Sequence, residues 1–362
     1  MYIADLHNDV LQRAMLGENI IERSQNGHSD ISRLINAQIN LEVFVIWITK
    51  QYLAHKAFER ANQMIDKLHE IEKKSNLTKI IKSQKDLIIA KEKNLLATPF
   101  AIEGGECLEN KIENLLHFIN RGLLYIGPTW NYSTSLASSS FDEKNNPKNL
   151  KFKGLTNFGL EVIKICNQKK VIIDVSHIGE QSFWDIIRHS SKPIIASHSC
   201  VYNICPHYRN LKDDQLIAIK NKKGVVFLNL YSNFVDKDYA KRENFLTRTL
   251  EKEIFKINKE FADSEKRWIA KQYYLQKAYQ SIAPSIELFI DHIDYIVKFL
   301  GIDYVGIGSD YDGMDSTPKQ IQDCSDHMLI AKELEKRKYS YYDIEKIMGL
   351  NFCRVYEEVN SK

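Results

Sequence analysis

Eight short apolar segments recur along the chain, and each is followed by a polar cluster and then by a longer segment with helical spacing. The segments are YIADLH (2–7), LEVFVIWI (41–48), PFAIEGG (99–105), GLLYIGPTW (122–130), VIIDVSH (171–177), PIIASHS (193–199), GVVFLNLY (224–231) and YVGIGSDYDG (304–313). Nearly continuous apolar strands that alternate with helices are typical of parallel β/α units whose sheet is covered on both faces. Eight such units predict an α/β fold, a (β/α)8 TIM barrel.

The length of the chain agrees with one such barrel. Barrels of this kind reach more than 400 residues (roughly 250 is typical) when they carry insertions, so the 362 residues fit a single domain over 1–362. One long charged stretch of helical periodicity interrupts the pattern between the seventh and eighth strands, at about 235–290. We predict a helical insertion there, packed near the rim of the site or at a subunit contact. The plainer alternative is a solvated helical hairpin without a special role.

Charge, apolar runs and cysteines exclude several classes of protein. The formal net charge is +3 with both signs mixed, and no basic stripe carries interleaved aromatics, so no nucleic acid is expected as a partner. The longest apolar run, at 43–48, is too short to cross a bilayer. The first residues lack the features of a secretory signal, and six cysteines are scattered without CxxC spacing. We therefore expect a cytoplasmic protein with reduced thiols and no membrane span.

Metal-capable side chains stand at the ends of many of the predicted strands. They are His7, Asp9, Glu103, His177, His198 and Asp310, which Asp312 follows. Functional residues of a barrel come from the C-terminal ends of different strands, so these side chains would share one mouth. A single histidine there is more often structural, and a single acid is more often a helix cap. Taken together, the set predicts a metal site, and its N and O donors suit Zn²⁺ or a similar divalent ion.

These donors outnumber the needs of one catalytic ion. A four-coordinate ion that keeps an open position takes three protein ligands, and the set offers more imidazoles and carboxylates than that. Two ions that share one carboxylate would use them well. Water that bridges two metals has a lowered pKa and becomes hydroxide near neutral pH, and an additional aspartate could take and return a proton. The set therefore indicates metal-assisted hydrolysis.

Several motifs give the chain a strong resemblance to one family. They are DLHND, IEGGECL, GLTNFG followed by VIIDVSH, PIIASHS, CPHYRNLKDDQL, GVVFLNLYSNF and HIDYIVKFLGIDYVGIGSDYDGM. In this order, and from about residue 3 to the C-terminus, they resemble the membrane (renal) dipeptidase family of the amidohydrolase-like metal-dependent hydrolases. The resemblance implies a dinuclear zinc dipeptidase and suggests a homodimer.

The resemblance also implies roles for individual residues. His7 and Asp9 would hold the first zinc ion, Glu103 would bridge both ions, and His177 and His198 would complete the second site.

Further roles belong to residues that would contact the substrate. Asp310 matches the family's acid/base residue, and Arg209 matches the position that binds the C-terminal carboxylate of the dipeptide. A planar guanidinium suits that role because it pairs bidentately with a carboxylate. Tyr231 matches a pocket tyrosine, although a packing role is equally possible.

One position departs from the family pattern. The fourth strand of the family usually ends in Thr-His-Asn, whose histidine is thought to steady the carbonyl oxygen in the transition state. This chain has Trp130 there, and an indole donates one N–H but neither accepts a hydrogen bond nor becomes cationic. Loss of a well-aimed donor to an oxyanion typically costs on the order of 10²–10³ in rate. Trp130 therefore predicts a reshaped substrate pocket.

Three functions agree with these observations. The first is a zinc dipeptidase that hydrolyses the amide bond of a dipeptide, or of a dipeptide-like substrate, through a metal-bridging hydroxide. The second is a related zinc amidohydrolase that acts on a specialised non-dipeptide amide or a biosynthetic intermediate. The third is a metal-binding homologue without catalysis, which is the least favoured because the predicted ligand set is complete.

Overall fold

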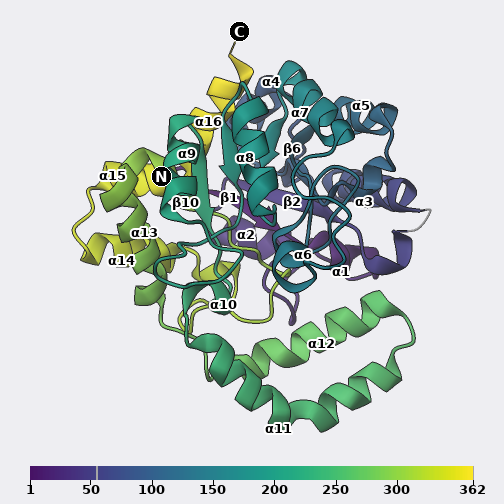
Figure 1. Ribbon diagram of the computed structural model, residues 1–362. Helices are drawn as coiled ribbons and strands as arrows, with labels where there is room; N and C mark the ends of the chain where they lie inside the picture. Colours follow the sequence, from purple (N-terminus) through teal and green to yellow (C-terminus); the bar gives the residue numbers. More distant parts are fainter. Residues whose placement is uncertain (54–55, 362) are drawn as a thin grey trace.

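A closed barrel of eight parallel strands forms the centre of the molecule, and helices surround it (Figure 1). The computed structural model describes residues 1–53 and 56–361. The barrel strands are β1 (Ala4–Asn8), β2 (Leu41–Trp47), β5 (Phe100–Glu103), β6 (Leu123–Gly127), β7 (Ile172–Asp174), β8 (Ile194–Ala196), β9 (Val225–Leu228) and β10 (Val305–Ile307). Their order is β1-β10-β9-β8-β7-β6-β5-β2, and the pairing of β1 with β2 closes the ring. Each predicted strand segment overlaps one of these strands, so the predicted barrel is confirmed.

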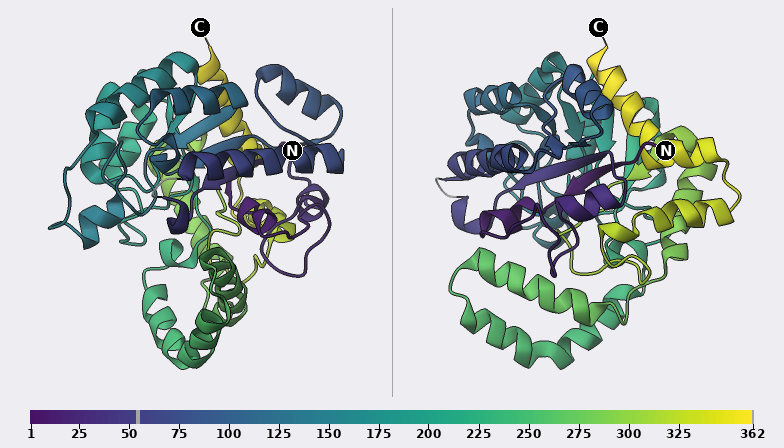
Figure 2. Two further views of the ribbon diagram at one scale, coloured as in Figure 1. Left: turned by 90° about the vertical axis from the view of Figure 1, so that its right-hand side faces the viewer. Right: turned by 180° about the vertical axis from the view of Figure 1, so that it is seen from behind.

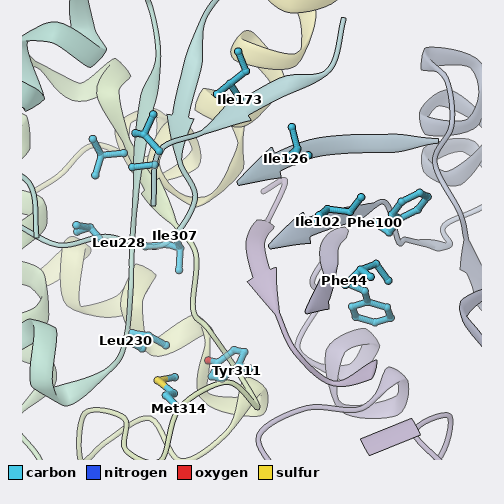
Figure 3. Packing of buried hydrophobic residues seen from close by; sticks show 14 of the residues in the cluster. Phe44, Phe100, Ile102, Ile126, Ile173, Leu228, Leu230, Ile307, Tyr311 and Met314 are labelled. Carbon is cyan, nitrogen blue, oxygen red and sulfur yellow. The ribbon is translucent and has the colours of Figure 1, made fainter. Parts of the chain in front are cut away.

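Both faces of the strands are buried, which explains the nearly continuous apolar runs. Successive residues of a strand point to opposite faces, and they enter two different apolar clusters: Phe100 and Ile102 of β5 belong to one, and Ala101 between them belongs to the other. Figure 3 shows part of the first cluster, where Phe44, Phe100 and Ile102 lie together. Apolar burial of this kind supplies most of the stabilisation of a barrel.

Two further strands extend the sheet and were not predicted. The strands β3 (Thr78–Lys79) and β4 (Leu96–Ala97) flank helix α4 (Gln84–Glu92), and β4 pairs with β2 at Leu41. Each contains two residues, which is too short to produce a recognisable period of apolar residues.

Helices cover the outside of the barrel (Figure 2). The α-helices besides α4 are α1 (Leu11–Met15), α2 (Ile31–Asn36), α3 (Ala57–Ser75), α5 (Ile112–Arg121), α6 (Ser140–Asn145), α7 (Asn157–Lys169), α8 (Glu180–His189), α9 (Asp213–Asn221), α10 (Ser232–Val235), α11 (Tyr239–Glu260), α12 (Ser264–Tyr279), α13 (Ile286–Leu300), α14 (Met328–Lys336), α15 (Tyr341–Glu345) and α16 (Asn351–Asn360). Short 3₁₀ turns lie at Lys50–Tyr52, Gly105–Leu108, Ile302–Tyr304 and Cys324–Asp326, and a π turn lies at Lys346–Leu350. Helix α5 illustrates the local logic, since it buries Leu115 and Phe118 and ends at Gly122, whose φ of 105° favours glycine.

The predicted helical insertion between the seventh and eighth barrel strands is confirmed. Helices α11 and α12 form a hairpin that projects from one end of the barrel, at the bottom of Figure 1. The hairpin spans Tyr239–Tyr279, within the expected stretch of about 235–290, and α13, which begins at Ile286, is the regular barrel helix before β10. Both stretches are helical and adjacent, so periodicity alone could not separate them.

The two helices of the insertion differ in how they contact the barrel. Glu265 of α12 is buried, and its carboxylate accepts hydrogen bonds from Arg60 at 2.7 Å and from Thr49 at 2.8 Å. Helix α11 contributes one fully buried residue, Tyr239, and leaves Phe245 exposed. The alternative of a solvated hairpin therefore fails for α12, which is anchored to the barrel. Across residues 1–53 and 56–361, no helix combines the length and apolar character that crossing a bilayer requires.

Candidate metal centre and substrate pocket

Side chains from five strand ends meet at the mouth of the barrel, around the carboxylate of Glu103. Its Oε1 atom lies 2.9 Å from Nε2 of His177, 3.3 Å from Nε2 of His198 and 3.6 Å from Nε2 of His7. Asp9 Oδ2 lies 3.7 Å from Nε2 of His7. The donor atoms of His7, Asp9 and Asp310 also lie within 4.8 Å of one another. The structure thus brings together all six side chains that strand ends predicted; their roles as ligands and acid stay proposals.

The alignment of parallel strands explains this convergence. Glu103 is the last residue of β5 and pairs in register with Trp47, the last residue of β2. His177 and Asp310 follow their strands in the left-handed backbone region, with φ values of 64° and 66°. This conformation is uncommon for residues other than glycine and costs of order 1 kcal/mol. Residues with such backbone strain concentrate at functional sites.

Hydrogen bonds orient the ring of His7. The hydroxyl of Tyr125 donates to the carbonyl of Leu6 at 2.8 Å, so its oxygen accepts the proton of His7 Nδ1 at 2.9 Å. A neutral ring with its proton on Nδ1 presents a lone pair on Nε2. That Nε2 atom is buried and has no hydrogen-bond partner among the described residues.

The same logic applies to the other two rings. Ser197 Oγ donates to Asp174 at 2.7 Å and therefore accepts from Nδ1 of His198, also at 2.7 Å. His177 Nδ1 donates to Oδ1 of Asn131 at 3.0 Å. All three imidazoles therefore direct Nε2 lone pairs toward Glu103. Such outer hydrogen bonds are what fix metal-ligating histidines in one tautomer.

A cation fits this arrangement and resolves its electrostatic conflict. The Nε2 atoms of His177 and His198 lie 2.9 Å apart, and lone pairs that face each other in a buried site are unfavourable without a cation or proton between them. Without a metal ion a proton would take the place of the cation: burial would raise the pKa of Glu103, but positive charge on His7 and His177 outweighs burial and holds that pKa well below its usual range. Burial, followed by repulsion from Glu103, raises the pKa of Asp9 well above its usual range. The N and O donor set suits Zn²⁺ or a similar divalent ion.

Asp310 lies beside these donors in a different environment. Its Oδ2 atom accepts a hydrogen bond from Asn229 Nδ2 at 2.9 Å, and its backbone N–H donates to the carbonyl of His7 at 3.0 Å. Burial raises the pKa of the Asp310 carboxyl to about 6. A carboxyl whose pKa approaches neutrality, next to a reactive centre, can both accept and return a proton.

Arg209 is the cation of the pocket. Its side chain is 4% exposed and lies over the ring of Phe234 at 5.2 Å. Nη1 donates to Ser199 Oγ and Nη2 to the carbonyl of His198, each at 3.3 Å, while Nε has no hydrogen-bond partner in the described part of the chain. These partners are neutral. A buried guanidinium held by neutral groups is costly alone and is suited to pair with an anion that enters the pocket.

A cavity of about 290 Å³ lies over this centre. It is near the lower end of the volumes typical of small-molecule sites, roughly 300–1,000 Å³. Predicted residues that line it are Asp9, Glu103, Trp130, His177, Arg209, Tyr231 and Asp310, whereas His7 and His198 are buried beneath it. Tyr231 packs against Phe234 with ring centroids 4.9 Å apart. The cavity therefore fits a compact ligand that meets the centre and Arg209 together.

Two tryptophans of the pocket were missed by the sequence analysis. Trp47 ends β2, and Trp268 comes from α12 of the insertion; both line the cavity with Trp130. The position of Trp47 at a strand end was a usable signal, but a search for polar ligands passes over an apolar side chain. For Trp268 no local signal exists, because it lies within a helix whose docking is a tertiary property.

The chain is similar to known proteins in sequence and in structure. The sequence profile of the membrane dipeptidase family (peptidase family M19) matches residues 1–362. An uncharacterized dipeptidase of Schizosaccharomyces pombe is 26% identical over 98% of the chain and 80% of that protein. A metallopeptidase of Rhodobacter sphaeroides, solved with a phosphinate mimic of L-Ala-D-Ala, has a TM-score of 0.80 at 22% identity over 99% of both chains. The probable dipeptidase PvdM of Pseudomonas aeruginosa has a TM-score of 0.78 at 21% identity, covering 99% of this chain and 95% of the other. At these identities the two solved structures show the shared fold.

Proposed function

Because the chain belongs to the membrane dipeptidase family, peptidase family M19, whose members hydrolyse peptide bonds, we propose that it is a dinuclear zinc dipeptidase. The observation that carries the proposal is the position of one carboxylate, that of Glu103, within 3.6 Å of three imidazole nitrogens. The proposal assigns His7 and Asp9 to one ion, His177 and His198 to the other, and Glu103 to both. When bound, the ion pair would supply Lewis-acid polarisation of a carbonyl and a water molecule of lowered pKa.

The residues of the chain would then position the substrate and move protons. Arg209 would pair with the C-terminal carboxylate of the dipeptide, which places the scissile bond over the Glu103 cluster. Asp310 would accept a proton and deliver it to the leaving amine, and the hydrogen bond from Asn229 would keep its carboxylate in place. Tyr231 would close the side of the pocket next to Phe234. Holding the reacting groups in this geometry supplies much of the rate enhancement of such enzymes.

Two finer properties belong to the same proposal. All six cysteines are free, and reduced thiols are usual in a cytoplasm, which supports a cytoplasmic location. A homodimer follows from the family resemblance and is tested by the mass of the protein in solution.

A second function is favoured by Trp130. Its ring lies 6.2 Å from the ring of His177 and lines the cavity, where the family pattern has a histidine. An amidohydrolase for a specialised amide or a biosynthetic intermediate would use the Trp130 ring as a packing surface in place of the missing histidine donor.

One experiment tests the proposal and separates these functions. The protein is stripped with a chelator, reloaded with zinc, and assayed on a panel of L,L and L,D dipeptides, with the bound metal counted per chain. We expect two zinc ions and release of free amino acids. A dipeptide whose C-terminus is an amide should react on the order of 100-fold more slowly, because Arg209 loses its charged partner. Two bound ions without cleavage of any dipeptide would exclude the dipeptidase and leave the specialised amide.

A further inference from the structure

Three of the four tryptophans of the chain gather on one side of the cavity. The ring centroids of Trp47 and Trp130 lie 4.8 Å apart, and those of Trp47 and Trp268 lie 5.6 Å apart. All three side chains are half-buried and line the cavity. We call Trp47, Trp130 and Trp268 the tryptophan wall. Tilted aromatic rings at such distances form a continuous apolar surface against which another flat group can pack.

The insertion is built so that Trp268 reaches this wall. Glu265 and Trp268 are three residues apart on α12 and therefore share one face of the helix. Glu265 accepts a hydrogen bond from Thr49, two residues after Trp47, and pairs with Arg60. Tyr273, further along α12, bonds with Arg13 at 2.8 Å. These contacts fix α12 beside the end of β2, so the position of Trp268 does not depend on a bound substrate.

Trp47, which contacts both other rings of the wall, lies opposite the predicted carboxylate anchor. Arg209 follows β8, and Trp47 ends β2; in the closed ring, β2 is four strands from β8 in either direction. The Glu103 cluster lies between them, since Glu103 ends β5, the neighbour of β2, and the carbonyl of His198 on the other side accepts a hydrogen bond from Arg209. A dipeptide whose C-terminal carboxylate meets Arg209, and whose amide lies at Glu103, must extend its N-terminal residue toward the wall.

We propose that the tryptophan wall selects dipeptides whose N-terminal residue carries a large, flat, uncharged side chain, an inference that rests on the proposed dipeptidase function. A cationic side chain is disfavoured because a lysine already lies close to the wall. Lys50 Nζ lies over the ring of Tyr132 at 5.8 Å, and Tyr132 packs against Trp130 with centroids 5.3 Å apart. The insertion thereby acquires a role, because it supplies one of the three rings.

The test compares substrates that differ in one residue. The zinc-loaded protein is assayed on Trp-Ala, Phe-Ala, Ala-Ala, Lys-Ala and Ala-Phe. We expect kcat/KM for Trp-Ala and Phe-Ala to exceed that for Ala-Ala by about tenfold or more, which is the size of discrimination that an apolar pocket achieves. Trp268→Ala should reduce this ratio about tenfold, and Trp268→Phe should retain most of it because a ring remains. Trp184, which lies outside the cavity on α8 and packs against Phe183, provides the control: Trp184→Ala should leave the ratio unchanged.

Each contrary result has a distinct meaning. A ratio near one, or a ratio that Trp268→Ala does not change, overturns the proposal. Preference for Lys-Ala would make the wall a cation site, and preference for Ala-Phe would place the C-terminal residue there; both overturn it. If no dipeptide is cleaved, the proposed dipeptidase function is wrong, and ligand binding then tests the proposed selectivity of the tryptophan wall. Phosphinate mimics of Phe-Ala and Ala-Ala are then titrated by tryptophan fluorescence, and equal affinities would overturn the proposal.

Discussion

The two sides of the pocket are built in different ways. The Glu103 cluster comes from strand ends, and its rings are oriented by buried partners such as Tyr125 and Ser197. The tryptophan wall is half-buried, and one of its members, Trp268, is delivered by a helix outside the barrel repeat. A barrel of this kind would hold its chemistry on the rigid scaffold, and the proposed selectivity would come from an insertion. Rigid elements keep ligands within narrow geometric limits, whereas an apolar wall tolerates change.

The largest expected effect comes from the centre of the cluster. Glu103→Gln removes the negative charge that faces three imidazoles, so we expect loss of bound zinc and a fall in kcat/KM of about 10³-fold or more, the rate equivalent of breaking a buried charged pair. Metal counting and steady-state kinetics measure both effects. Glu106→Gln is the matched control, because Glu106 is a neighbouring half-buried acid whose pKa burial raises to about 7. Equal losses in the two variants would contradict the assignment of Glu103.

A smaller effect is expected at Tyr125, which contacts the candidate ligand His7. Tyr125→Phe removes the hydroxyl that holds His7 in its Nδ1–H tautomer. Loss of such a partner typically weakens metal binding about 10- to 100-fold, which a competition titration against a zinc chelator measures. Tyr239→Phe, at a buried tyrosine of α11, should leave zinc affinity unchanged. An unchanged zinc affinity in Tyr125→Phe would show that the Tyr125 hydroxyl does not orient His7 for metal binding.

Buried histidines away from the mouth should behave differently from the cluster. His292 of α13 accepts a hydrogen bond from the Val201 N–H and donates to the Val235 carbonyl, and burial lowers its pKa to about 4. Its unfolded pKa is about 6.5, so the folded state resists protonation. Its contribution to stability is present in full above pH 6.5 and is lost as pH falls toward 4. At pH 5 the loss is about 2 kcal/mol, or roughly 30-fold in the folding equilibrium.

Urea unfolding of the metal-free protein at pH 7 and pH 5 measures this loss. His292→Gln is less stable at pH 7 because it disturbs two hydrogen bonds, but its decrease between the two pH values should be smaller by about that amount. An equal decrease in both proteins would show that His292 is not the group that titrates.

The smallest effect is expected at the wall. Trp130→His restores a polar donor near His177, so we expect kcat/KM for Ala-Ala to rise about tenfold, which is less than the roughly 10²–10³ that a well-aimed transition-state donor contributes. The same variant should lose part of its preference for aromatic N-terminal residues. A lower kcat/KM for every substrate would indicate instead that Trp130 supports the centre, and the contrast between the two sides would disappear.

Much of the fold could be predicted because its signals are local. Both faces of each barrel strand are buried, so each strand was visible as an apolar run, and the polar residues after many of the runs marked the same end of the ring. The strands β3 and β4 were missed because two residues carry no period. The boundary between the insertion and α13 has no local signal, because α13 continues the helical pattern after a short break.

The sequence by itself determined the eight strands, the insertion and the candidate ligands, since apolar periodicity and strand-end polarity are properties of adjacent residues. Only the tertiary structure decided which nitrogen of each imidazole faces Glu103, because that depends on Tyr125, Ser197 and Asn131 from other parts of the chain. It also decided that Trp268 meets Trp47. No local pattern specifies where a helix docks when its anchors, Arg60 and Thr49, lie some two hundred residues away along the chain.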